Sequence, residues 1–195
     1  MEGNIGPEEA LQRLMKGNER FVEGESVHPN QGHDRRREVA GGQRPFAVVL
    51  GCSDSRIPPE LVFDTGIGDL FVVRVAGNIA DDAVLGSIEY AAEHLGVDLV
   101  MVLGHQKCGA IQACVAGGEP QGCVASVLRA LKPAAEAAIS KPGDAVDNTV
   151  RLNVAQVVTS VKAAQPVLSS LTSAGKLRVV GAYYSLDTGR VEILE

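Results

Sequence analysis

The sequence contains no apolar run close to the roughly 20 residues that a membrane-spanning helix requires, which excludes an integral membrane protein. It has no tryptophan and only four cysteines, and none of these forms a C-x-x-C pair, which argues against a thiol oxidoreductase. No Walker loop or G-x-G-x-x-G follows a predicted strand, so a nucleotide-binding domain is not expected. The 195 residues are 45% hydrophobic and 22% charged, as is usual for one soluble globular domain.

A clustered basic surface is also missing, because the formal net charge is -6. This argues against nucleic acid as a partner, since phosphate binding requires grouped Lys and Arg side chains. The only basic run is 35–37, on a predicted helix, and we interpret it as a solvated face or an ion pair between subunits. The acidic N-terminus has no basic region followed by an apolar core, so we expect a cytoplasmic protein, or a periplasmic one only if a signal peptide was removed.

Short apolar runs that end at glycine are typical of strands buried on both faces of a parallel sheet. An amphipathic segment between two such runs predicts a right-handed strand-helix-strand crossover. The expected elements are a helix over 7–23, strands over 45–51, 70–77 and 97–104, a helix over 81–96, helical segments from 121 to 173, and two strands within 177–194.

These elements predict a single α/β domain over 1–195, with a central, mostly parallel β-sheet flanked by helices. Within it we expect an N-terminal helical arm over 1–40 and an α/β zinc-binding core over 41–195. The zinc site follows from two motifs that end predicted strands.

GCSDSR ends the first predicted strand and GHQKCG ends the third. Ligands of open α/β sheets bind beyond the carboxyl ends of strands, so Cys52, His105 and Cys108 are expected to meet there. Two thiolates and one imidazole match the tetrahedral S/N ligand set that Zn²⁺ prefers, and three ligands leave a fourth position for water. The sequence therefore predicts one zinc ion per chain.

Asp54 and Arg56 lie two and four residues beyond Cys52. The carboxylate is placed either to accept the proton of a zinc-bound water or to serve as a fourth ligand that closes the site. Arg56 is expected to hold it in a bidentate pair and keep it ionised. A permanently closed site would make this a structural zinc protein, which is the alternative from another functional class.

Taken singly, a Cys, a His or an Asp-x-Arg pair is more often structural than functional. Cys114 and Cys123 match no ligand position, and we expect both to be core thiols. The case for a metal site depends on three ligand types converging at the ends of two strands.

CSDSR followed about 50 residues later by GHxxCG closely resembles the β-class carbonic anhydrases. The segments GNERFV, DLFVVRVAGN, GSIEYA and GAYYSLDTG resemble family segments in the same order, so the likeness covers nearly the whole chain. Members bind zinc through two Cys and one His and interconvert CO₂ and bicarbonate, with zinc-bound hydroxide attacking CO₂. The resemblance implies this activity here, with Asp54 and Arg56 as the catalytic dyad.

The resemblance also implies residues around the substrate. Gln43 matches a glutamine that donates a hydrogen bond to the substrate in plant-type members, and Phe71, Ala76 and Tyr90 match positions lining the CO₂ pocket, partly across a subunit interface. The N–H of Gly109, at a helix start, is placed to steer an anionic oxygen. As family members are built on dimers, a homodimer or a dimer of dimers (a homotetramer) is expected.

His94, four residues after Tyr90 on one helix face, is a candidate proton relay. Val49 stands where bicarbonate-regulated members have a Trp, so we expect the open, plant-type form of the site. Relatives on this scaffold hydrolyse carbonyl sulfide or carbon disulfide with the same ligands, and this remains the alternative activity.

Overall fold

A five-stranded sheet forms the centre of the protein in the order β2-β1-β3-β4-β5. The computed structural model describes residues 5–118 and 120–194. The first four strands are mutually parallel and β5 is antiparallel to β4. Their bounds are β1 Ala47–Gly51, β2 Leu70–Arg74, β3 Leu99–His105, β4 Arg178–Tyr184 and β5 Val191–Leu194. The predicted α/β class with a mostly parallel sheet is confirmed.

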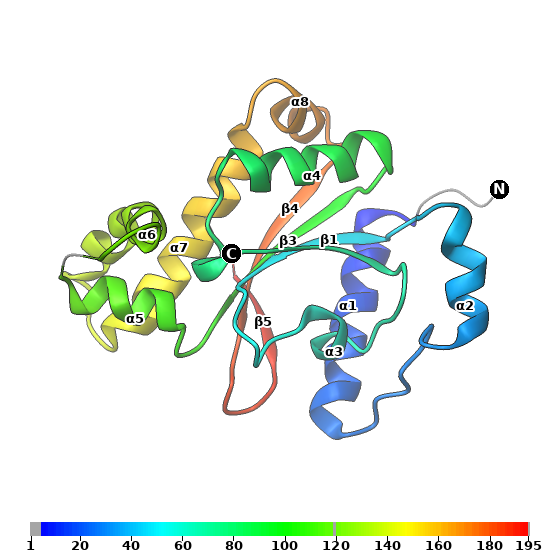
Figure 1. The fold of residues 1–195 in the computed structure, drawn as a ribbon, viewed down its shortest axis with the longest axis horizontal. Coiled ribbons are helices and arrows are strands. Elements are labelled where there is room, and N and C mark those ends of the chain that lie inside the picture. Colours follow the sequence, from blue (N-terminus) through cyan, green and yellow to red (C-terminus); the bar gives the residue numbers. More distant parts are fainter. Residues whose placement is uncertain (1–4, 119, 195) are drawn as a thin grey trace.

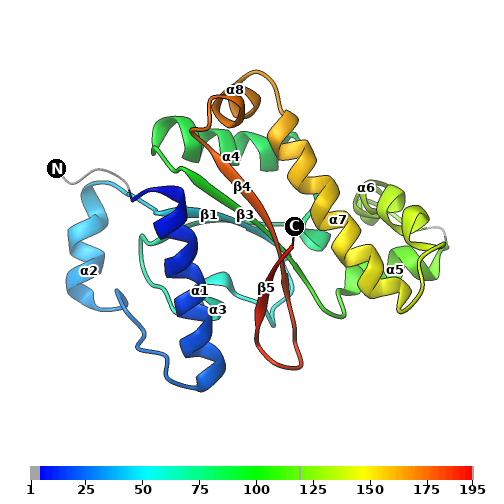
Figure 2. The same cartoon turned by 180° about the vertical axis from the view of Figure 1, so that it is seen from behind.

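Helices cover both faces of this sheet (Figures 1 and 2). On one face lie α4, α7 and α8, and on the other lie α1 and the short α3, while α5 and α6 form a projection beside α7. The helices are α1 Pro7–Glu23, α2 His33–Glu38, α3 Pro59–Val62, α4 Asp82–His94, α5 Gly109–Ala116, α6 Val124–Ala138, α7 Ala145–Ala163 and α8 Val167–Ser173, with 3₁₀ turns η1 Val39–Gly41 and η2 Ala76–Asn78.

Strands β1 and β3 are buried on both faces, which explains why their sequences are continuous apolar runs rather than alternating ones. Val48 and Val100 pack in the cluster that includes α4, α7 and α8. Val49 and Met101 point the other way, into the cluster that includes α1. The position held by Val49 is therefore ordinary core in this chain.

Helix α1 has the bounds that its sequence signals predict. Pro7 occupies the first turn, two acids follow it, and Gly24 ends the helix with φ of 72°, donating its N–H to the carbonyls of Arg20 and Phe21. The apolar side, with Leu11 and Leu14 buried, lies on the sheet of the same chain. The segment expected as an N-terminal arm thus begins with a helix packed on its own domain.

Helix α7 approaches β3 and β4 closely because two glycines face it. A Cβ on Gly104 would lie 2.5 Å from Val154 Cγ2, and a Cβ on Gly181 would lie 2.8 Å from Val154 Cγ1. Any side chain at either position would push the helix away from the sheet. The glycine before His105 is therefore needed for packing.

The basic run lies on α2, as predicted. Arg35 does more than face solvent, because its Nε donates to the carbonyl of Ile67 at 2.9 Å, and its Nη2 lies 3.6 Å from Asp69. These contacts attach α2, which buries none of its residues, to the loop before β2. None of the helices in the described part of the chain is long and apolar enough to span a membrane.

Asn18 connects α1 to two other parts of the fold. Its Nδ2 donates to the carbonyl of Val62 at 3.1 Å and to that of Gly189 at 2.8 Å, and its Oδ1 accepts the N–H of Val191 at 2.8 Å. The residue is only 3% exposed, so each backbone group it pairs would be left without water if the amide were removed.

We predict that Asn18→Ala lowers the free energy of unfolding by about 2–4 kcal/mol, because three buried hydrogen bonds are lost together. Urea unfolding followed by circular dichroism measures this. Glu19→Ala, an exposed neighbour on the same helix, is the control and should change stability by less than about 0.5 kcal/mol. Equal effects of the two substitutions would contradict the role given to Asn18.

Candidate metal centre

Three side chains with metal-binding groups lie at the carboxyl edge of the sheet. Cys52 follows the last residue of β1, His105 is the last residue of β3, and Cys108 precedes the first turn of α5. The strand register pairs Gly51 with Leu103, so both strands deliver their ligands to the same edge. The sequence-based expectation that these residues meet is confirmed by their positions.

The three ligand atoms lie within 4.8 Å of one another, and all three residues are buried. The two sulfurs are 4.0 Å apart. For comparison, two thiolates on one tetrahedral zinc, at about 2.3 Å each, are separated by roughly 3.8 Å. The donor set and its spacing therefore fit a metal ion of the zinc type.

The imidazole of His105 is oriented for coordination. Its Nδ1 lies 2.9 Å from the carbonyl oxygen of Gln106, which fixes this nitrogen as the N–H donor. The other nitrogen, Nε2, is buried and has no hydrogen-bond partner among the described residues. A buried nitrogen lone pair that faces two sulfurs and no donor is the arrangement a metal ligand requires.

The thiols differ in their ease of ionisation. A hydrogen bond from Cys108, with further donation from the N–H of Gly77, lowers the pKa of Cys52 against the opposing effect of burial. The Cys52 sulfur and burial raise the pKa of Cys108, although the N–H groups of Ile111 and Ala110 at the start of α5 act in the other direction. A divalent cation between the sulfurs would favour the thiolate form of both.

Backbone hydrogen bonds hold the Cys52 loop in place. The N–H of Gly77 lies 3.3 Å from Cys52 Sγ, and the carbonyl of Gly77 accepts from Asn153 Nδ2 at 3.0 Å. Arg74 Nε donates to the carbonyl of Cys52 at 2.8 Å, and its Nη2 donates to the carbonyl of Asp54 at 2.5 Å. These residues fix the first ligand without contacting a metal themselves.

Asp54 and Arg56 form the bidentate pair that the sequence predicts. Arg56 Nε donates to Asp54 Oδ1 at 2.9 Å and Nη2 donates to Oδ2 at 2.7 Å. The same Nη2 also donates to the carbonyl of Lys107 at 3.1 Å, and Asp54 Oδ2 lies 3.9 Å from His105 Nε2. The guanidinium lowers the pKa of Asp54 to about 2, so the carboxylate beside the ligands is ionised at neutral pH.

The structure does not bring Gln43 to the metal centre of its own chain. Gln43 is exposed and precedes β1, whereas Cys52 follows β1, so the two lie at opposite ends of a strand about 17 Å long. Ala76 lies in η2 beside Gly77, and Gly109 is the first residue of α5. These two are therefore close to the ligand loops.

Phe71 lies on the edge strand β2 and packs with the cluster that includes α4, and Tyr90 lies on α4. Their ring centroids are 6.2 Å apart, and Tyr90 is 47% exposed. The ring of His94 follows at 5.3 Å from that of Tyr90, with Nε2 3.8 Å from Glu93. The three rings form a row that runs from the partly buried Phe71 to the exposed Tyr90 and His94, and the roles predicted for them stay predictions.

One expectation about the cysteines is wrong. Cys123 is exposed and precedes α6, so it is not a core thiol, because it lies in the exposed stretch 121–124 where the chain enters that helix. Cys114 is partly buried, with Sγ 3.6 Å from the carbonyl of Leu128. Sequence reasoning also missed the contacts of Arg74, Gly77 and Asn153 with the ligand loop, since these join backbone groups that no motif spacing reveals.

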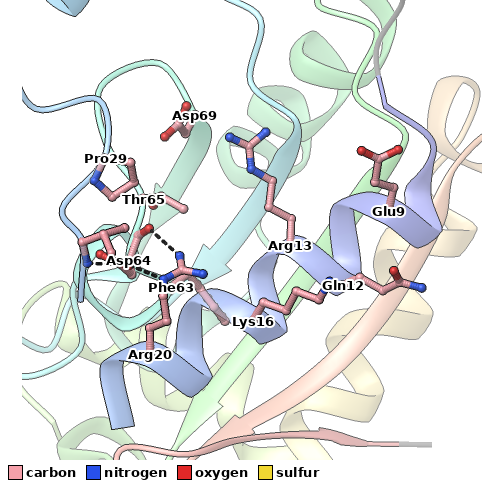
Figure 3. Close-up of a pocket in the computed structure, with 11 residues that line it drawn as sticks. Glu9, Gln12, Arg13, Lys16, Arg20, Pro29, Phe63, Asp64, Thr65 and Asp69 are labelled. Carbon is pink, nitrogen blue, oxygen red and sulfur yellow. Dashed lines mark hydrogen bonds and ion pairs between the residues drawn. The ribbon is translucent and has the colours of Figure 1, made fainter. Parts of the chain in front are cut away.

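A separate hollow of about 610 Å³ lies between α1 and the loop after α3 (Figure 3). Arg13, Lys16 and Arg20 line its α1 side, facing the loop with Asp64 and Asp69. Asp64 accepts from Arg20 Nε at 2.6 Å and from two backbone N–H groups, and its side chain is fully buried. Asp64 is thus used to hold the fold together, and the hollow contains none of the three ligands.

Comparison with known proteins agrees with this geometry. The sequence profile of the carbonic anhydrase family matches residues 47–191. Carbonic anhydrase 2 of Mycobacterium tuberculosis is 43% identical over 191 residues, covering 96% of this chain and 92% of its own length.

Solved structures give the class within that family. A tetrameric β-carbonic anhydrase from Sordaria macrospora has a TM-score of 0.75 at 26% identity, covering 95% of this chain and 97% of its own. The Coccomyxa β-carbonic anhydrase bound to acetazolamide has a TM-score of 0.75 at 28% identity, covering 94% and 86%. The chain therefore belongs to the β-class of the carbonic anhydrase family.

Proposed function

We propose that the protein catalyses the reversible hydration of CO₂ to bicarbonate and a proton, with one zinc ion per chain held by Cys52, His105 and Cys108. The observation that carries this proposal is the unpartnered Nε2 of His105, buried against two thiol sulfurs and 3.9 Å from an ionised carboxylate. Membership in the carbonic anhydrase family supports CO₂ as the substrate rather than carbonyl sulfide or carbon disulfide.

When bound, zinc lowers the pKa of a coordinated water from about 15.7 toward about 7 and so supplies the hydroxide that CO₂ chemistry needs. The chain's own contribution is to orient that nucleophile by accepting a hydrogen bond from it. Asp54 is the group placed for this task, because its Oδ2 lies beside the ligand nitrogen of His105. Arg56 holds the carboxylate by both oxygens and keeps it ionised.

We propose that the site works in the open form, with Asp54 as an acceptor rather than a fourth ligand. The bidentate pair with Arg56 supports this, since Nε and Nη2 each hold one carboxylate oxygen and a move of Asp54 to the metal would strain that charged pair. The N–H of Gly109 is proposed to receive an anionic oxygen of bicarbonate near the start of α5.

Gln43, Phe71, Ala76 and Tyr90 are proposed to line the CO₂ pocket, with His94 as a proton relay at its rim. Because Gln43 lies at the end of β1 opposite to Cys52, it can serve only the site of another copy. The half-buried edge strand β2 and the exposed ring of Tyr90 are suited to such a contact. A homodimer or a dimer of dimers is therefore part of the proposal, and the Sordaria relative is a tetramer.

We predict that Cys108→Ser reduces bound zinc below about 0.1 per chain and lowers CO₂ hydration at least 100-fold, since a buried hydroxyl is a poor substitute for a thiolate. Metal analysis and stopped-flow hydration at pH 7 and pH 9 measure the two effects. Cys114→Ser, at the partly buried thiol outside the site, is the matched control and should retain both. If the wild-type protein binds zinc but does not hydrate CO₂ at either pH, the structural-zinc alternative would be favoured.

Removal of the metal from the wild-type protein by a chelator should abolish hydration, and added Zn²⁺ should restore it. Rates that persist in metal-free protein, or a carbonyl sulfide rate far above the CO₂ rate, would contradict the proposal.

Asp54→Asn should lower kcat/KM for hydration by about 100-fold, because the uncharged amide accepts a weaker hydrogen bond from the nucleophile and cannot keep both bonds to Arg56. Asp54 has a depressed pKa of about 2, so its charge is present throughout pH 6 to 9 and is lost only as the pH falls through about 2. The substitution should therefore lower the pH-rate profile without moving its midpoint. Asp34→Asn, in an exposed Asp–Arg pair on α2, is the control; a midpoint shift confined to Asp54→Asn would contradict this assignment.

A further inference from the structure

The turn between β4 and β5 is attached to the metal-binding loop 105–108 through one carboxylate. Asp187 Oδ2 accepts from Gln106 Nε2 at 2.8 Å, and its Oδ1 accepts from Lys107 Nζ at 2.7 Å. The other end of the Gln106 amide is used as well, because its Oε1 accepts the N–H of Asp187 at 3.1 Å and lies 3.4 Å from Ser185 Oγ. Both residues between the ligands His105 and Cys108 therefore have their side chains fixed on the same turn.

The carbonyl groups of these two residues hold different parts of the site. The carbonyl of Gln106 lies 2.9 Å from His105 Nδ1 and so sets the direction of the ligand ring. The carbonyl of Lys107 accepts from Arg56 Nη2 at 3.1 Å, and that guanidinium in turn holds Asp54. A change in the peptide planes at 106 and 107 would thus turn the imidazole and displace the dyad.

The backbone at Lys107 needs an external restraint. Its φ is +55°, a left-handed conformation that is less favourable than the right-handed one for a residue with a Cβ. Such conformations persist where the surroundings impose them. The contact between the Lys107 ammonium and Asp187 is a side-chain restraint on this residue, and its Nζ makes no other hydrogen bond among those found in the described residues.

We propose that Asp187 is a positioning residue for the metal centre, acting through Gln106 and Lys107 on the His105 ring and on the Asp54–Arg56 pair. This inference rests on the proposed zinc-dependent function, which it extends by naming a residue outside the ligand motifs. Asp187 lies in the exposed turn, with 59% of its side chain accessible, and touches neither the ligand atoms nor the dyad in the interactions found. An exposed ion pair contributes little to global stability, so its main effect is expected at the loop it holds.

The test compares zinc-loaded Asp187→Asn with the wild type. Asparagine keeps the size and one acceptor oxygen, but it presents an NH₂ group to one of the two donors. Thr188→Ala is the matched control, because Thr188 lies in the same turn and bonds only within it. Three quantities are measured for each protein: the rate of zinc release to a chelator, the absorption spectrum of the Co²⁺-substituted protein, and kcat and KM for CO₂ hydration.

For Asp187→Asn we expect zinc release to be about 3- to 10-fold faster, the Co²⁺ d–d bands to be altered, and kcat to fall about 3- to 10-fold with KM within twofold. These effects are smaller than the 10- to 100-fold that loss of a direct partner of a metal ligand typically causes. The midpoint of thermal unfolding should stay within about 2 °C of the wild type. Lys107→Met should have a similar effect. In the double variant, the fold-changes in zinc release and kcat should be smaller than the products of the fold-changes in the two single variants.

A lower unfolding midpoint with an unchanged Co²⁺ spectrum, zinc release rate and kcat would show that Asp187 only fastens the turn, and would overturn the inference. So would equal effects from Thr188→Ala. Faster zinc release and an altered spectrum in a protein that never hydrates CO₂ would uphold the positioning role while rejecting the proposed function, so the two failures are distinguishable.

Discussion

Two buried sulfurs 4.0 Å apart and a buried imidazole nitrogen, which has no hydrogen-bond partner in the described part of the chain, form the constraint around which the rest of this structure is arranged. Burial penalises each unpaired polar group, and two thiolates at that distance repel each other strongly in a medium of low polarity. A divalent cation satisfies all three groups at once. The fold therefore has to hold the ligands at a separation that suits a metal, which places strict demands on the loops that carry them.

Those demands are met mainly by main-chain groups. The N–H of Gly77 points at Cys52 Sγ, and the start of α5 directs N–H groups toward Cys108. Glycine at 104 and at 181 lets α7 approach the sheet closely, and the same helix carries Asn153, whose amide fixes the carbonyl of Gly77. Packing on one face of the sheet is thereby linked to the position of a ligand at its edge.

The ligand triad and the Asp54–Arg56 pair could be predicted because they depend on facts that a sequence carries directly. Strand ends are marked by glycine after an apolar run, and short spacing within a loop limits where the neighbouring side chains point. The bounds of α1 were predictable for the same reason, since Pro7 and Gly24 are local signals.

Contacts between distant segments were not predictable in this way. The guanidinium of Arg74 bonds the carbonyls of Cys52 and Asp54, which lie 22 and 20 residues earlier in the chain. Cys123 resembled a core thiol only because no other role was visible, and its exposure follows from its place in the exposed stretch 121–124, where the chain enters α6. Spacing along the chain says nothing about which backbone carbonyl a long side chain will reach.

The negative charge of Asp54 also depends on contacts between separate loops. Both of its oxygens accept from Arg56, and Arg56 also bonds the carbonyl of Lys107. A move of the carboxylate toward a metal would strain this charged pair, whose guanidinium is bound to the loop that carries His105 and Cys108. Since charged hydrogen bonds of this kind are stronger than neutral ones, the pair with Arg56 holds Asp54 as an ionised hydrogen-bond acceptor beside the ligands.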